Sequence, residues 1–234
     1  MEDKMKAVSK IMISLFLAGT CAAAVAQEYK YEIGGAAGAA NYMGDANMND
    51  MFLNFNPAVG VVFRENLNFR WSMAADLLLG RVNGDTKNVK NVFPYDAQTS
   101  FERIFVELGG HIEFNFVPYS DKYAYLNTSP ITPYIFAGLG LTYASGTDRF
   151  FGFQLPLGLG LRYKLMNRLN LGLEVAVHQL FSDDFDTPDK KEKFNLNDPY
   201  KTGGGTFKNN DSYNTVLFTI TWDIGLRTDG CCEP

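Results

Sequence analysis

Residues Phe153 to Leu165 read FQLPLGLGLRYKL, and every second residue of this stretch is apolar. A period of two is typical of a β-strand whose two faces meet different surroundings. The apolar face consists of Phe153, Leu155, Leu157, Leu159, Leu161, Tyr163 and Leu165. The other face carries Gln154, Pro156, Gly158, Gly160, Arg162 and Lys164.

Two environments suit such a strand. A soluble sandwich buries the apolar face against a second sheet, whereas an outer-membrane barrel leaves it in lipid and turns its polar face inward. At about 3.4 Å per residue and a tilt of about 40–45°, the bracketing aromatics Phe153 and Tyr163 stand about 25 Å apart along the membrane normal. Because this is the height of a barrel's apolar band, we expect the following residues to face lipid: Phe153, Leu155, Leu157, Leu159, Leu161 and Tyr163.

The N-terminus has the layout of a secretory signal peptide. A basic segment that ends at Lys10 precedes an apolar run from Ile11 to Leu17, which is too short to span a bilayer. Ala24-Val-Ala26 then supplies a cleavage site. Cys21 leaves a lipoprotein signal as an alternative, but the neighbouring Thr20 suits lipidation poorly.

The predicted organisation has three parts. Residues 1–26 form the signal peptide, 27–228 the barrel, and 229–234 a short periplasmic tail. No later run of about 20 apolar residues predicts a transmembrane helix. The mean hydropathy is only −0.13, as expected when strands alternate, and the 19 Phe and 12 Tyr residues suit aromatic girdles. A formal net charge of −5 gives no sign of a nucleic-acid partner.

The mature chain contains eight strand-like stretches. They are predicted at residues 28–40, 54–64, 67–82, 101–117, 131–143, 153–165, 169–181 and 212–227. Tight turns are expected at Glu65-Asn66 and Met166–Arg168, and long loops at 83–99 and 182–211. The connection at 118–130 falls on the periplasmic side, where short turns are expected, and is the exception because it is long. The pattern predicts an all-β fold, an eight-stranded antiparallel up-and-down transmembrane β-barrel of the outer-membrane type, with both termini periplasmic.

The inward faces carry charges of both signs. The predicted lumen charge cluster is Glu32, Arg70, Asp76, Arg103, Glu107, Glu113, Arg162, Lys164, Glu174 and Asp223. An eight-stranded barrel is just wide enough inside for side chains, and buried charges must pair. We therefore favour a salt-bridged plug over a conduction pathway.

Catalytic and metal-binding patterns give little support to an enzyme. His111 and His178 fall on inward faces, without a cluster of Cys or carboxylates at ligand spacing. We expect no catalytic residues, no cofactor and no metal. A membrane-rim enzyme would need a nucleophile near one of these histidines. Asp183, Asp184, Asp186 and Asp189 leave a calcium loop as an alternative to a solvated one, although the EF-hand spacing is missing.

Cys231 and Cys232 remain after the predicted cleavage. Adjacent cysteines rarely bond to each other because the geometry is strained. In an oxidising periplasm they are candidates for binding a partner through a disulfide, and a dispensable tail is the alternative.

Three segments of the mature chain together carry a family resemblance: Tyr31–Asp45 (YEIGGAAGAANYMGD), Pro133–Gly140 (PYIFAGLG) and Leu171–Asp184 (LGLEVAVHQLFSDD). They resemble segments of the PorG-like outer-membrane barrels of Bacteroidota. The family's opening pattern is matched by Glu32, Gly34, Gly38, Tyr42, Gly44 and Asp45. Its second element is approximately matched by Gly172, Glu174, Phe181, Asp183 and Asp186.

The resemblance implies an eight-stranded barrel of the type IX secretion system, which anchors periplasmic ring subunits, a lipoprotein and its partner, to the outer membrane. The expected partners are therefore outer-membrane lipid and these ring proteins. The alternative function is an OmpA-like structural or adhesive barrel whose extracellular loops bind ligands.

Overall fold

The computed structural model describes residues 29–44, 55–86, 99–120, 127–182, 184–186 and 211–226. The predicted signal peptide and tail, with Cys231 and Cys232, lie outside the described residues. So do Asp183 and Asp189 of the acidic loop.

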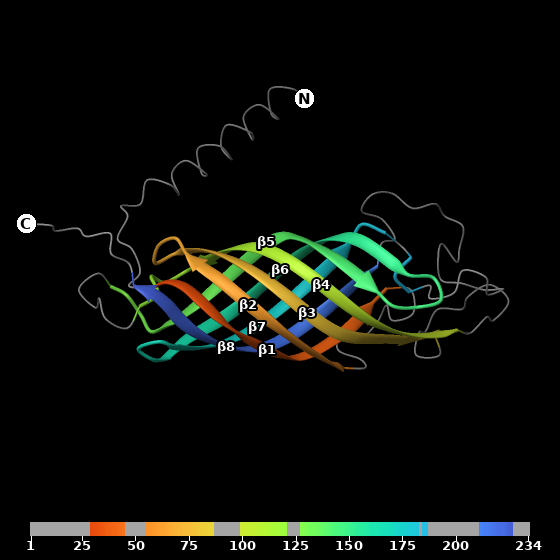
Figure 1. The fold of residues 1–234 in the computed structure, drawn as a ribbon, viewed down its shortest axis with the longest axis horizontal. Helices are drawn as coiled ribbons and strands as arrows, with labels where there is room; N and C mark the ends of the chain where they lie inside the picture. The colour runs from red at the N-terminus through yellow and green to blue at the C-terminus, as the bar shows by residue number, and fades with distance from the viewer. Residues whose placement is uncertain are drawn as a thin grey trace, which may run out of the picture.

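The described residues form eight strands that close into a barrel (Figure 1). The strands are β1 (Tyr29–Met43), β2 (Asn56–Asn66), β3 (Trp71–Asp85), β4 (Ser100–Asn115), β5 (Ile131–Ala144), β6 (Phe150–Met166), β7 (Leu169–Leu180) and β8 (Ser212–Leu226). Each strand pairs antiparallel with the next, and β1 pairs with β8 from Tyr29–Leu226 to Met43–Ser212. The predicted eight-stranded antiparallel barrel is confirmed.

The two ends of the barrel differ in their connections. One end, which we name the turn end, carries the start of β1, the finish of β8 and the short β2–β3 and β6–β7 turns (left in Figure 1). The β4–β5 connection also lies there. The other end, the loop end, carries the connections that follow β1, β3, β5 and β7.

The β2–β3 turn differs from the prediction. The turn consists of Leu67 to Arg70, whereas Glu65 and Asn66 still belong to β2. The Asn68 side chain causes the shift, because its Oδ1 accepts the backbone N–H groups of Arg70 at 2.8 Å and Trp71 at 2.9 Å. Such a local side-chain bond competes with strand pairing and starts β3 later than alternation alone predicts.

The outer face of the barrel is apolar on every strand. Exposed apolar residues, one from each strand in order, are Ile33, Val61, Leu77, Leu108, Ile135, Leu159, Leu173 and Ile220. All six side chains expected to face lipid lie on this face: Phe153, Leu157, Leu159, Leu161 and Tyr163 are exposed, and Leu155 is half-buried. No helix among the described residues is long and apolar enough to cross a bilayer.

The buried residues lie inside the barrel and are mostly polar or aromatic. On β5, whose two faces are both apolar, the structure turns Tyr134 and Phe136 inward and Ile135 outward. On β1, Gly34 and Gly38 are needed because β8 approaches closely. A Cβ at these positions would collide with the carbonyl oxygens of Ile220 and Val216.

Candidate functional site

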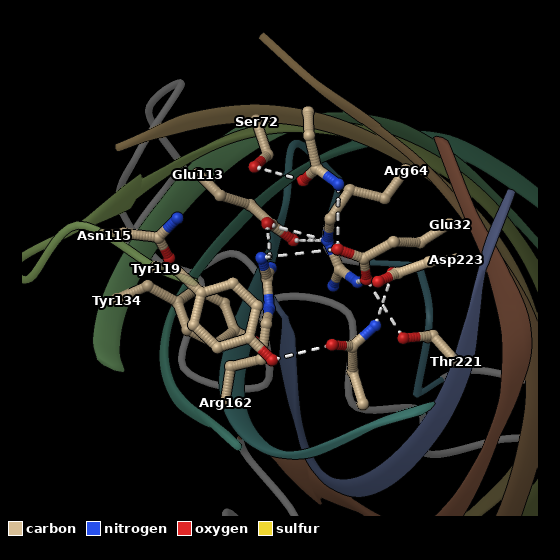
Figure 2. A network of polar contacts seen from close by, with 12 residues as sticks. Glu32, Arg64, Ser72, Glu113, Asn115, Tyr119, Tyr134, Arg162, Thr221 and Asp223 are labelled. Carbon is tan, nitrogen blue, oxygen red and sulfur yellow. Dashed lines mark hydrogen bonds and ion pairs between the residues drawn. The ribbon is translucent and has the colours of Figure 1, made fainter. Parts of the chain in front are cut away.

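Four charged side chains from different strands meet inside the barrel near the turn end. We name Glu32 (β1), Arg64 (β2), Glu113 (β4) and Arg162 (β6) the ionic network (Figure 2). Arg64 Nη1 lies 2.8 Å from Glu32 Oε2, and Arg64 Nε lies 2.8 Å from Glu113 Oε2. Arg162 pairs with the same Glu113 oxygen and approaches Glu32. At most 2% of any of these side chains is exposed.

Neutral groups complete the hydrogen bonding of Glu32. Asn66 Nδ2 donates to its Oε1 at 2.9 Å, and Thr221 Oγ1 donates to its Oε2 at 3.0 Å. Ser72 holds Asn66 by donating to Asn66 Oδ1 at 2.9 Å (Figure 2). Burial of a carboxylate is costly unless it is both paired and hydrogen-bonded. The neutral donors around Glu32 therefore help to keep its charged form stable inside the barrel.

A second layer extends the ionic network through aromatic rings. Tyr134 donates its phenolic proton to Glu174 Oε1 at 2.5 Å, and Arg64 Nη2 lies 3.5 Å from the same oxygen. The Arg162 guanidinium lies 4.9 Å from the centre of the Tyr134 ring and 5.3 Å from that of Tyr119. Cation–π contacts of this kind contribute more when the cation has lost its water.

Tyr119 closes the turn end of the lumen. It belongs to the β4–β5 connection, and its backbone N–H donates to Phe69 O at 3.0 Å. Its hydroxyl donates to Asn170 Oδ1 at 2.8 Å, and Asn170 Nδ2 donates to Asp223 Oδ1 at 2.6 Å. Lys164 Nζ lies 2.6 Å from Asp223 Oδ2. Burial raises the pKa of Tyr119 above its ordinary value, so the phenol stays a neutral donor.

The two histidines lie deep in the lumen. His111 faces Asp76 at 3.2 Å through Nδ1 and Glu113 at 3.3 Å through Nε2. Two carboxylate acceptors suit a ring that donates from both nitrogens. His178 Nδ1 lies 3.1 Å from Glu107 Oε1, and its ring stacks on Tyr213 with centroids 4.6 Å apart.

A small cavity of about 40 Å³ separates the two histidine groups. Its polar lining includes Asp76, Glu107, His111, Glu174 and His178. A site needs only about 10–15 Å³ of such volume and two to four polar partners to hold a water molecule. The cavity is therefore large and polar enough to hold water.

An aromatic cluster fills the lumen toward the loop end. Phe185, from the β7–β8 connection, is fully buried there, with ring centroids 5.2 Å from Phe150 and 5.6 Å from Tyr213. Asp211 Oδ2 accepts the Phe185 and Asp186 backbone N–H groups at 3.0 and 3.2 Å. These bonds hold Phe185 inside the loop end of the barrel.

Tyr42 ties both ends of the β7–β8 connection to β1. Its hydroxyl lies 2.7 Å from Asp186 Oδ2 and 2.6 Å from Asp211 Oδ1. Asp186 and Asp211, which flank residues 187–210 in the sequence, thus lie close together.

Eight of the predicted lumen charges lie in the contacts described above: Glu32, Asp76, Glu107, Glu113, Arg162, Lys164, Glu174 and Asp223. Arg103 is buried near the loop end, where its Nη2 donates to Asp148 O at 3.2 Å. Arg70 was expected among them and is not there. It lies exposed in the β2–β3 turn and donates from Nη1 to Phe116 O at 2.9 Å.

Sequence reasoning missed several residues that organise the lumen. Arg64 lies on the inward face that the β2 alternation predicts, so that pattern contained the signal. The inward orientation of Tyr134 could not be predicted, because both faces of its strand are apolar. Tyr119 and Phe185 lie in connections, where periodicity carries no information about direction.

The residues that carry the resemblance to PorG-like barrels have structural roles in the lumen. Glu32 of the first motif and Glu174 of the second both contact Arg64. Tyr42 of the first motif contacts Asp186 of the second at the loop end. The two motifs therefore meet twice inside the barrel.

The described charged side chains of the lumen are engaged with one another and with neighbouring polar groups. Within the described ranges, no group of three or more His, Cys, Asp or Glu residues is placed to hold a metal ion. His111 and His178 are buried in the middle of the lumen, and neither lies at a membrane rim where an acyl chain could reach it.

A family model described as "Domain of unknown function (DUF6089)" matches residues 9–233. No curated protein matches the chain. Neisserial surface protein A (NspA) is similar in structure, with a TM-score of 0.51 and 14% identity over 83% of this chain and 97% of that one.

Two further structures are similar. Ail, the attachment invasion locus protein of Yersinia pestis, has a TM-score of 0.47 and 10% identity over 85% of this chain and 100% of that one. The outer membrane protein OprG from Pseudomonas aeruginosa has a TM-score of 0.45 and 10% identity over 85% and 97%. The likeness to NspA is one of fold, that of the small outer-membrane β-barrels.

Proposed function

Because the chain belongs to the DUF6089 family, a domain of unknown function, we propose its role from its lumen: it is a non-enzymatic, non-conducting outer-membrane barrel that anchors periplasmic proteins. The turn end faces the periplasm in this proposal. The short turns then lie on the periplasmic side and the longer connections outside, as in outer-membrane barrels generally.

The filling of the lumen carries this proposal. The ionic network, Tyr119 and the Phe185 aromatic cluster occupy successive levels of the barrel. A solute would have to displace paired charges that are at most 2% exposed, and leaving a buried charge unpaired is strongly unfavourable. A barrel of this kind acts through its surfaces, which supports binding rather than transport.

The resemblance to PorG-like barrels supports a more specific role. In this role the chain is a component of the type IX secretion system and holds the ring subunits, a lipoprotein and its partner, at the outer membrane. Cys231 and Cys232 stay candidates for a covalent link to such a partner.

Affinity purification tests the anchoring role. A tagged full-length chain is captured from membranes dissolved in a mild detergent, and co-purifying proteins are identified by mass spectrometry. We expect periplasmic ring subunits, and deletion of the chain should abolish export of type IX cargo. Normal export after deletion would exclude the secretion role.

Two variants make the test more specific. Cys231→Ser with Cys232→Ser removes any disulfide link, which a non-reducing gel would show directly. Replacement of residues 187–210 by a short linker should leave ring capture unchanged, because these residues join β7 to β8 at the loop end.

The alternative is an OmpA-like structural or adhesive barrel. The Tyr42–Asp186–Asp211 contacts favour it as a second candidate, since they provide a fixed base for residues 187–210. Linker replacement of these residues, with Asp186 and Asp211 kept, should abolish adhesion of cells if the alternative holds. Replacement of the whole predicted loop at 182–211 would also remove Phe185 and confuse the result.

A further inference from the structure

Arg70 is an exposed cation at the turn end, next to the outer surface of the barrel. Its Nη1 donates to Phe116 O, just beyond the end of β4. Among the described residues it has no carboxylate within ion-pair distance, unlike Lys30 at the same end, which lies 3.6 Å from Glu65. The remaining guanidinium donors of Arg70 are therefore available to an anion from outside the protein.

Two adjoining hollows of about 640 and 760 Å³ lie on the outer face, and Trp71, the residue after Arg70, lines the larger one. They span β2 to β6 and share Ile112 and Ala137. The smaller hollow is also lined by Glu65, whose Oε1 lies 3.6 Å from Lys30 Nζ. Ala75 and Gly110, together with Ala137, are small residues among larger apolar neighbours. Because these side chains are small, the outer face is recessed there, and the two hollows together form an apolar groove.

The groove begins next to Arg70 and rises into the apolar band. Trp71, the residue after Arg70, pairs with Phe114, which pairs with Ile135, which in turn pairs with Leu159. Trp71 starts β3 at the turn end, whereas Leu159 lies well inside β6. The Trp71 and Phe114 rings, with centroids 4.8 Å apart, mark the lower end. Tryptophan prefers this interfacial level of a membrane.

We propose that this groove and Arg70 form a binding site for an anionic phospholipid of the leaflet at the turn end. The phosphate meets the Arg70 guanidinium, whose planar donors match phosphate oxygens in pairs. One acyl chain lies in the groove against Ile112, Ala137 and Leu159. Charge complementarity favours this occupant over a second copy of the chain. The carboxylate in the lining, Glu65, is paired with Lys30, whereas Arg70, next to Trp71 at the lower end of the larger hollow, has no carboxylate partner among the described residues. The site is independent of the proposed anchoring function.

Quenching of Trp71 fluorescence tests the site. The chain has two tryptophans, so Trp222→Phe leaves Trp71 as the reporter in the full-length barrel. The protein is placed in phosphatidylcholine vesicles that contain increasing fractions of brominated phosphatidylglycerol or brominated phosphatidylcholine. We expect phosphatidylglycerol to quench at about fivefold lower mole fraction, the factor that one cationic side chain gives at an anionic surface.

Matched variants assign the effect to the site. Arg70→Gln should remove the preference for phosphatidylglycerol, whereas Arg168→Gln, in the other short turn, should keep it. Ala137→Leu fills the groove and should weaken quenching by both brominated lipids. Each variant is first shown to be folded by its heat-dependent mobility on a gel.

Two results would overturn the proposal. Equal quenching by both lipids, or an unchanged preference in Arg70→Gln, excludes phosphate recognition at this position. Crosslinking of Met73→Cys between two barrels, with no lipid preference, would instead assign the groove to a second copy of the chain.

Discussion

Buried charge pairs are the residue-scale feature that sets this barrel apart from a soluble protein. Arg64→Ala removes the guanidinium that pairs with both Glu32 and Glu113. We expect a loss of about 3–5 kcal/mol in the free energy of unfolding, because removal of one partner of a buried ion pair leaves the other charge uncompensated. Urea unfolding in lipid vesicles, followed by tryptophan fluorescence, measures it.

Arg81→Ala is the matched control. Arg81 pairs with Glu102 on the outer face, with about half of each side chain exposed (47% and 56%). Exposed pairs contribute about 0–1 kcal/mol. Equal losses for the two variants would show that the ionic network does not stabilise the fold.

The glycines of β1 provide a second prediction at this scale. Gly34→Ala would place a Cβ against the Ile220 carbonyl, whereas at the neighbouring Gly35 the nearest atom, Gly60 O, is 3.8 Å away. We expect Gly34→Ala to cost about 1–3 kcal/mol, as overpacking does. Gly35→Ala should change the free energy of unfolding by no more than about 0.5 kcal/mol. Similar values for both would contradict the close approach of β8.

Among the elements, the β7–β8 connection is part plug and part loop. Phe185, Asp186 and Asp211 belong to the plug through their contacts in the lumen. Replacing residues 187–210 by a short linker should keep the unfolding free energy within about 1 kcal/mol, because a shorter loop costs little to close. Extending the replacement to 184–210 also removes the buried Phe185 and should cost about 3–5 kcal/mol. The same urea titration compares the two.

Strands and turns were predictable to different degrees. The sequence located all eight strands, and on those that alternate the period of two also indicated which face points outward. The prediction misplaced the β2–β3 turn, since the Asn68 side chain decides where β3 starts. The alternation assigned the faces of β3 correctly from Trp71 onward, and Arg70 was placed in the expected lumen cluster because the predicted strand began too early. On β5, where apolar residues occupy both faces, only the pairing with β4 and β6 shows that Tyr134 points inward.

The whole molecule behaves as a closed cylinder. We expect the purified full-length barrel to show no ion conductance in a planar bilayer, because charges and rings fill its interior. Phe185→Ala should also stay closed, since the ionic network still blocks the turn end. Discrete current steps from the wild-type protein would contradict a filled lumen.

The sequence by itself determined the barrel, its apolar exterior and the mixed charge of its interior. These properties are local, since in the strands that alternate the position of a residue indicates whether it points outward or into the lumen. Only the tertiary structure decided which charges pair and what closes the ends. Glu32 and Glu113 share Arg64 because β1, β2 and β4 come together when the cylinder closes. Tyr119 and Phe185 enter the lumen from connections that follow no period, so their direction depends on contacts formed by the complete fold.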